Sequence, residues 1–124
     1  MAHPHNHAIS SVRKWGGTVE DYIRIHDFMD SSKAHYANWR HRAVLHNSFG
    51  IYLAEQVFGS TITISTGKQV PVRLVAEQHV IEDLGCIPTV SDWLRAIGDS
   101  TKIEPWMTRG VDRSVVRNDP EVQP

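Results

Sequence analysis

The stretch SSKAHYANWRHRAVLHNSFGIYLAEQVFG, residues 31–59, decides the fold, because it is the longest segment that one helix can occupy. Ser31 and Ser32 are good N-cap residues, no proline interrupts the run, and Gly59 stands where a helix would end. A continuous helix of this length spans roughly 40 Å, which is longer than a small domain is wide. We therefore expect either a central spine or a break near Gly50.

The second half of this stretch is apolar around most of the helix. Between Ala43 and Gly67, Glu55 is the sole residue with a full formal charge. A helix that is apolar on all sides is enclosed, by its own domain or by a partner subunit. We therefore expect a homo-oligomer, with a dimer as the first choice. We also expect Glu55 to have a partner, such as an arginine, because burying an unpaired carboxylate is costly.

The rest of the chain has the patterns of short helices and one hairpin. The predicted elements are a helix over Asp21–Met29 opened by Thr18, a β-hairpin over Thr61–Val75, and short helices over Ala76–Leu84 and Val90–Ile97. The predicted fold class is therefore α+β, mostly helical. A long central helix would pack with a second helix, the hairpin and the two short C-terminal helices.

The chain divides into three regions by composition. Residues 1–17 form an N-terminal arm and loop, whose histidine-rich opening we expect to be mobile, since nothing orders it locally. Residues 18–98 form a single globular α+β domain. Residues 99–124 are polar and proline-containing, which predicts an irregular, partly disordered tail, with Trp106 as a candidate anchor.

Length and charge exclude several classes of protein. The 124 residues support one domain with a modest core, and the net charge of −1, from 13 basic and 14 acidic residues, gives no field for non-specific nucleic-acid binding. Neither a signal-peptide pattern nor a long apolar run is present, so no membrane association is expected. A single cysteine fits a reducing compartment. We expect a soluble cytoplasmic protein.

A metal site can be assembled from two of the predicted helices. His79 and Asp83 lie four residues apart, so they share a helix face, and His46 is the best third ligand. Such a His/His/carboxylate set suits a divalent transition metal such as zinc, manganese or iron and leaves a position for water. Glu77 or Glu82 would then serve as the base of a hydrolase.

The alternative interpretation needs no metal. Glu82 and Asp83 would form a solvated face, and His79 would lie at its boundary. No His-Glu-x-x-His or Cys-x-x-Cys motif supports a metal site. Both interpretations remain open at this stage.

An arginine-rich run gives a second candidate site. Arg40 and Arg42 flank His41, and guanidinium groups suit phosphate or carboxylate recognition, although on a helix the two point about 160° apart. Alternatively, one arginine ties two helices together through an acidic residue, Asp27, Asp30 or Glu55. The ligand-binding candidates are Trp39, Arg40, His41, Arg42 and Glu55.

Three strings carry a resemblance to a known family: KWGGTVEDY, HRAVLHNSFGIYLAEQVFG and VPVRLVAEQHVIEDLGCIPTVSDWL. They resemble a widespread family of small proteins of bacteria and their phages, a domain of unknown function. The resemblance covers roughly residues 3 to 97. It implies a cytoplasmic protein of bacterial or phage origin, and it carries over no catalytic residue.

Two hypotheses follow. The first is a small bacterial or phage accessory protein that binds a small anionic ligand or a host protein as an oligomer. The alternative is a metal-dependent hydrolase of a phosphorylated or nucleotide-like substrate. Stoichiometric metal would favour the second hypothesis, and a tight metal-free oligomer the first.

Overall fold

The computed structural model describes residues 3–36, 38–96 and 99–117. Its helices are α1 (Pro4–Trp15), α2 (Val19–Met29), α3 (Arg42–Leu45), α4 (Ser48–Phe58), α5 (Val72–Leu84), α6 (Val90–Leu94) and α7 (Arg113–Arg117). Short 3₁₀ turns are η1 (Ser31–Ala34), η2 (Trp39–His41), η3 (Ser100–Lys102) and η4 (Pro105–Thr108), and the strands are β1 (Thr61–Thr63) and β2 (Gln69–Pro71). The predicted class, α+β and mostly helical, is confirmed.

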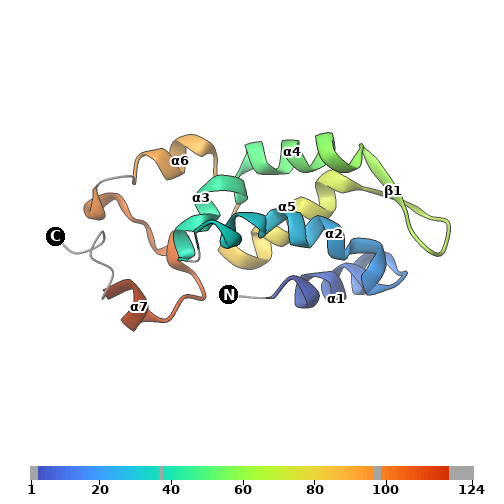
Figure 1. The fold of residues 1–124 in the computed structure, drawn as a ribbon, viewed down its shortest axis with the longest axis horizontal. Coiled ribbons are helices and arrows are strands. Elements are labelled where there is room, and N and C mark those ends of the chain that lie inside the picture. The colour runs from blue at the N-terminus through green and yellow to red at the C-terminus, as the bar shows by residue number, and fades with distance from the viewer. Residues whose placement is uncertain (1–2, 37, 97–98, 118–124) are drawn as a thin grey trace.

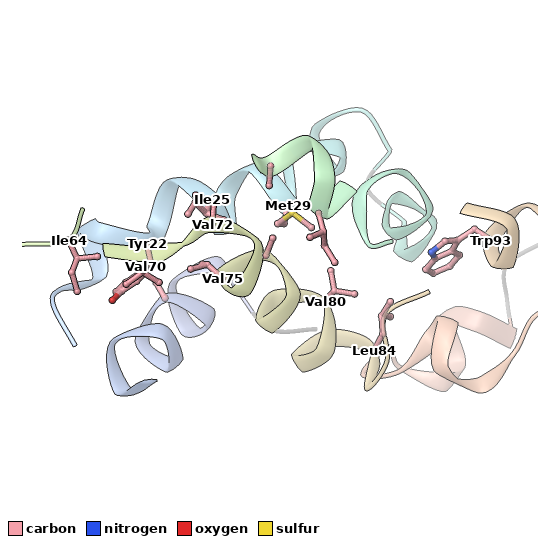
Figure 2. Packing of buried hydrophobic residues seen from close by; sticks show 14 of the residues in the cluster. Tyr22, Ile25, Met29, Ile64, Val70, Val72, Val75, Val80, Leu84 and Trp93 are labelled. Atoms are coloured by element: carbon pink, nitrogen blue, oxygen red, sulfur yellow. The ribbon is translucent and has the colours of Figure 1, made fainter. Parts of the chain in front are cut away.

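Helices α1, α2 and α5 lie against one another, and α4 runs along α5 (Figure 1). The hairpin lies at one end of the molecule and α6 and α7 at the other (Figure 1). Tyr22, Ile25 and Met29 of α2 face Val75 and Val80 of α5 across the buried core (Figure 2). This helical spacing buries one stripe of α2, as the sequence predicted.

Of the two alternatives for residues 31–59, the continuous helix is wrong and the break near Gly50 is found. Two 3₁₀ turns and the short α3 replace its first half, and α4 begins only at Ser48. Asn47 causes the break between α3 and α4, because its Oδ1 accepts a hydrogen bond from the Gly50 backbone N–H at 2.8 Å. Asn38 likewise caps η2 by accepting from the Arg40 N–H at 3.0 Å. Asparagine side chains compete with helix continuation in this way.

Gly50, in the first turn of α4, allows the turn between α3 and α4 to close tightly. A Cβ atom at this position would lie 1.8 Å from the carbonyl oxygen of Leu45. The close backbone approach that glycine permits is therefore used here. The break falls at His46 and Asn47, one turn before Gly50, so His46 sits at a corner of the chain and not on a helix face.

The rest of the described chain does not enclose α4. The side chains of Phe49, Tyr52 and Val57 are 51 %, 53 % and 59 % exposed. Glu55 is half-buried, and no ion pair joins it to another described residue, so the arginine partner expected within the chain is not found there. The outer face of α4 thus remains apolar and open.

The N-terminal opening is helical, so the expectation of a mobile arm over residues 4–15 is wrong. Pro4 stands in the first turn of α1, where its missing N–H costs nothing. His7, Ala8 and Ser11 are buried against α2 and α5. These contacts fix the segment, and they bring His7 to the site described below.

The remaining local predictions hold in most details. The antiparallel hairpin pairs Thr61 with Pro71 and Thr63 with Gln69. The Thr89 cap of α6 is confirmed, and α5 starts four residues earlier than expected, at Val72. Trp106 packs edge-on against Trp93 at 5.0 Å, so it anchors the C-terminal segment as predicted.

The helix predicted over Val90–Ile97 ends earlier, at Leu94. Ile97 itself and residues 118–124 of the tail lie outside the described residues. The division into three regions stays a prediction. Among the described residues, no helix is both long enough and apolar enough to span a bilayer.

Candidate metal centre

Four buried side chains converge between α2, α3 and α5: Asp30, His46, His79 and Asp83. Asp30 follows the last residue of α2, and His46 follows the last residue of α3. His79 and Asp83 lie one turn apart on α5. The sequence analysis chose His46, His79 and Asp83 together, and the structure brings these three side chains to one point.

Asp30 was missed as a member of this group and was considered only as a salt-bridge partner. One signal could have found it. An acidic residue at the C-terminal end of a helix faces the negative end of the helix dipole, which is unfavourable unless something compensates it. Here Asp30 Oδ1 lies 3.2 Å from Nε2 of His79, so the carboxylate faces a histidine nitrogen at this helix end.

The ligand-type atoms alternate around a small space. Asp83 Oδ2 lies 2.9 Å from His46 Nε2 and 3.5 Å from His79 Nε2. Asp30 Oδ1 lies 3.2 Å from His79 Nε2 and 3.5 Å from His46 Nε2. A tetrahedral metal with bonds of about 2.0–2.1 Å holds its ligand atoms about 3.3 Å apart. The four measured separations bracket that value.

The group is almost completely buried. His46 and His79 are 0 % exposed, Asp83 4 % and Asp30 6 %. Asp30 Oδ2 and His46 Nδ1 have no hydrogen-bond partner among the described residues. Two buried carboxylates side by side are costly unless positive charge compensates them.

The protonation states suit metal ligation. Burial alone would raise the pKa of the Asp30 and Asp83 carboxyls, but the neighbouring histidines hold both pKa values below their ordinary range. Burial lowers the pKa of His79 and outweighs the opposing effect of the neighbouring Asp30 carboxylate. Ionised carboxylates and neutral imidazoles are the forms that bind metals.

A chain of hydrogen bonds orients the His79 ring, starting from Gln78. The Gln78 amide N–H₂ donates to the His7 carbonyl at 2.9 Å, so Gln78 Oε1 faces Ser11, whose hydroxyl donates to it at 2.7 Å. Ser11 Oγ then accepts from His26 Nε2, at 2.8 Å. His26 Nδ1 is left as an acceptor, and it lies 3.0 Å from His79 Nδ1.

This chain determines which nitrogen of His79 carries the proton. Burial and the neighbouring histidines lower the pKa of His26 to about 2, so its ring is neutral and Nδ1 accepts the proton of His79 Nδ1–H. His79 Nε2 therefore presents its lone pair to the group of four. Fixing the tautomer of a ligating histidine through its other nitrogen is the usual outer-shell arrangement of metal sites.

His7 lies between two carboxylates. Its Nδ1 lies 2.8 Å from Glu82 Oε1, and its Nε2 lies 3.1 Å from Asp83 Oδ1. Burial opposes the charged form, but the hydrogen bonds to Asp83 and Glu82 prevail and raise the pKa of His7. The His7 ring thus holds the Asp83 carboxylate in place from the side opposite His46.

The two proposed bases lie outside the group of four. Glu77 pairs with Arg73 at 3.1 Å, one turn earlier on α5. Glu82 is bound by His7 and by the Gln78 amide. The expectation that Asp83 lies on a solvated face and His79 at its boundary is wrong, because both side chains are buried, whereas Glu82 is exposed as expected.

A pocket of about 660 Å³ opens beside this centre, between η2, α3, α6 and η4. Three of the predicted ligand-binding residues line it: Trp39, Arg40 and His41. The His41 ring lies edge-on to the His46 ring, with 5.6 Å between centroids, and burial lowers the pKa of His41 to about 4.

The other two predicted ligand-binding residues lie elsewhere. Arg42 is fully buried, and its Nη1 donates to the carbonyl oxygens of Met107 and Arg109, at 3.2 and 2.9 Å. It therefore ties the C-terminal segment to α3. Glu55 is not among the residues that line the pocket.

Comparison with known protein families identifies the family of this chain. The model of the family described as "Domain of unknown function (DUF6915)" matches residues 2–107. The chain belongs to this family. The match spans α1 to η4, so it includes the four converging residues and the pocket. No curated protein and no solved structure matches the chain. The bacterial and phage distribution of the family stays a prediction.

Proposed function

We propose that the protein binds one divalent transition-metal ion through Asp30, His46, His79 and Asp83. The observation that carries this proposal is the alternating arrangement of two imidazole nitrogens and two carboxylate oxygens, 2.9–3.5 Å apart. Two further features support it. The His79 tautomer leaves Nε2 free of a proton, and Asp30 Oδ2 has no partner among the described residues.

Zinc, manganese and iron are the ions that this donor set accepts, because imidazole nitrogen and carboxylate oxygen are ligands common to all three. A bound ion would compensate the two buried carboxylates. It would also join the end of α2, the corner between α3 and α4, and α5. Metal binding and folding are therefore coupled in this proposal.

Chelation tests the proposal. An ion present at about 100 times its dissociation constant adds about 2.7 kcal/mol to the free energy of unfolding, which raises the melting temperature of a domain of this size by roughly 10 °C. We expect chelator to lower the melting temperature of the native protein and zinc, manganese or iron to restore it. The Asp30→Asn variant should show no such response, whereas Asp27→Asn, at an exposed site on α2, should respond like the native protein. An identical melting temperature with chelator and with each ion contradicts the proposal.

A second candidate function, hydrolysis of a phosphorylated or nucleotide-like substrate, is favoured by His41, which both lines the pocket and contacts His46. Under this hypothesis Glu82 is a better base than Glu77, which is paired with Arg73. Phosphatase and nucleotide-hydrolase assays of the metal-loaded protein test it, with Glu82→Gln expected to lower turnover. No turnover in any assay contradicts it.

We also propose that the protein is a dimer through α4. The open face with Phe49, Tyr52 and Val57 supports this, since adjoining exposed apolar side chains mark interaction surfaces. Light scattering after size exclusion should give twice the chain mass of 14.0 kDa, and a monomer would contradict it. A cytoplasmic location and binding of a host protein or a small anionic ligand stay predictions.

A further inference from the structure

We propose that the pocket beside the metal centre binds an amphipathic monocarboxylate, with an aliphatic body along the pocket wall and its carboxylate at Arg40, as in a medium-chain fatty acid. This names a chemical class for the small anionic ligand expected from the arginine-rich run. It goes beyond the proposed metal site and does not rest on it.

The size of the pocket suits a small organic molecule. Its volume of about 660 Å³ lies within the range of about 300–1,000 Å³ usual for small-molecule sites. Residues of η2 and α3 line it together with residues of α6 and η4, which are distant in the chain. The pocket is therefore a product of the fold and not of one local segment.

A ligand can touch only those lining side chains that keep accessible surface. Trp39, Trp93 and Met107 are 5 %, 3 % and 1 % exposed, and His41 is fully buried, so these four offer a ligand almost nothing. The lining residues that keep more surface are Tyr36, Arg40, Ala43, Val44, Ala96 and Ile103. Four of these six side chains are aliphatic, so the wall that a ligand can reach is mainly aliphatic.

This wall favours a ligand with a hydrocarbon body. Val44 is 56 % exposed, and the ring of Tyr36 is also open to water. A ligand that covers such side chains removes apolar surface of both molecules from water, which is favourable. Each methylene group that becomes buried tightens binding by about 4-fold. An aliphatic chain gains this repeatedly along its length.

Arg40 gives the pocket wall a positive charge. Among the lining residues that the structure describes, Arg40 alone is charged at neutral pH, because none is acidic and burial lowers the pKa of His41 to about 4. The Arg40 guanidinium lies over the Trp39 ring, 4.9 Å from its centroid, and the side chain is half-buried. A guanidinium binds a carboxylate through two parallel N–H···O hydrogen bonds.

The charge of the pocket separates the carboxylate from other head groups. An uncharged alcohol with the same chain would cover the aliphatic wall but gain no charge-assisted hydrogen bond. An ammonium group would be repelled by Arg40. A phosphate monoester carries about −1.5 to −2 charges at neutral pH, which one guanidinium does not balance. A carboxylate carries one charge and matches it.

Titration calorimetry of the full-length protein tests the proposal, with sodium octanoate as the probe. We expect saturable binding at one site per chain. Decanoate has two more methylene groups and should bind at least about 5-fold more tightly. The uncharged 1-octanol keeps the chain and should bind at least about 5-fold more weakly than octanoate. Octyl phosphate should also bind more weakly than octanoate.

Two variants with matched controls assign the head and the body of the ligand. Arg40→Gln should bind octanoate and 1-octanol equally. Arg24→Gln is its control, because the Arg24 guanidinium also lies over an aromatic ring, at 5.7 Å, but outside the pocket. Val44→Asn should weaken octanoate binding about 3- to 5-fold. Val57→Asn, 59 % exposed in α4, should not. Circular dichroism shows whether each variant keeps its fold.

Four results would overturn the proposal. They are no saturable binding of octanoate or decanoate, equal or tighter binding of 1-octanol or octyl phosphate to the native protein, an unchanged preference for octanoate in Arg40→Gln, and unchanged octanoate affinity in Val44→Asn. A loss of affinity in Val57→Asn instead would place the ligand on the outer face of α4.

Metal content, measured on the same samples, separates this proposal from the metal site. A metal-free protein that binds octanoate as described contradicts the metal proposal alone. A metal-loaded protein that binds neither octanoate nor decanoate contradicts the pocket proposal alone.

Discussion

At the scale of single residues, Ser11 has a larger role than its position in α1 indicates. Its hydroxyl connects Gln78 to His26, and His26 in turn receives the proton of His79 Nδ1. Removing the hydroxyl leaves His26 without its acceptor and frees the His79 ring to turn. The tautomer that supports metal binding would then no longer be fixed.

Ser11→Ala is therefore expected to weaken metal binding by about 10- to 100-fold, the usual effect of losing an outer-shell partner. Competition with a metal-sensitive dye measures the affinity. Ser91→Ala, at an exposed position in α6, removes the same hydroxyl group and should leave the affinity unchanged. Equal affinities of native protein and Ser11→Ala would show that the hydrogen-bond chain does not act on the metal site.

The spacing of residues predicted part of the site and missed the rest. His79 and Asp83 could be paired because four residues make one helical turn, and His46 could be added because it lies in the apolar stretch. Asp30 and His7 could not be placed. Asp30 reaches the site only because α2 ends beside α5, and His7 only because the opening segment folds as a helix onto both. Contacts between distant segments leave no local pattern.

At the scale of elements, the turn between α3 and α4 positions His46. The helical pattern of residues 31–59 left a continuous helix and a break near Gly50 both open, because only the side chain of Asn47 and the missing Cβ of Gly50 mark the turn. Spacing shows which residues share a helix face, but it cannot show that an asparagine will cap a new helix. The sequence therefore grouped His46 with His79 and Asp83, which the structure brings together, although the continuous helix considered for His46 does not exist.

Gly50→Ala should be strongly destabilising. The new Cβ would lie 1.8 Å from the Leu45 carbonyl oxygen, so the turn must open. We expect a loss of about 2–4 kcal/mol in the free energy of unfolding, measured by urea denaturation. Gln56→Ala, on the exposed side of α4, should change it by less than about 0.5 kcal/mol. A stability like that of the native protein in Gly50→Ala would show that the turn is not as tight as described.

Asp21 connects the start of α2 to the hairpin. Its Oδ2 accepts from the Thr18 backbone N–H at 2.8 Å and from the Ser65 hydroxyl at 2.8 Å, and its Oδ1 accepts from the Ser65 N–H at 2.9 Å. The hydrogen bond from Thr18, followed by those from Ser65, lowers the pKa of Asp21 below its ordinary value of 3.8. The folded state therefore favours the ionised carboxylate.

The stability that Asp21 contributes should consequently depend on pH. Because the pKa of Asp21 is lower in the folded state, its contribution to stability is complete above its pKa in the unfolded state. The contribution is lost as the pH falls through its pKa in the folded state. Asp21→Asn should lower the free energy of unfolding by about 1–2 kcal/mol at neutral pH. This difference from the native protein should shrink at about pH 3. Urea denaturation at both pH values measures it. A difference that stays constant or grows on acidification would contradict the assignment.

At the scale of the whole molecule, the buried group lies where the end of α2, the turn between α3 and α4, and α5 meet. The pocket next to it is lined in part by residues of α6 and η4. Helix α6 lies at the end of the molecule opposite the hairpin (Figure 1). Trp93 connects the two, because it lines the pocket and donates to the His46 carbonyl. A metal ion would thus stabilise the segments on which both sites depend.

The most direct test of the central claim is the metal content of untagged protein, measured by plasma mass spectrometry. We predict about one zinc, manganese or iron ion per chain in the native protein, and the same content in the exposed-site controls His35→Ala and Asp27→Asn. His46→Ala and Asp30→Asn should lose the ion. A native protein that is folded, contains no metal and takes up none of the three ions would contradict the account.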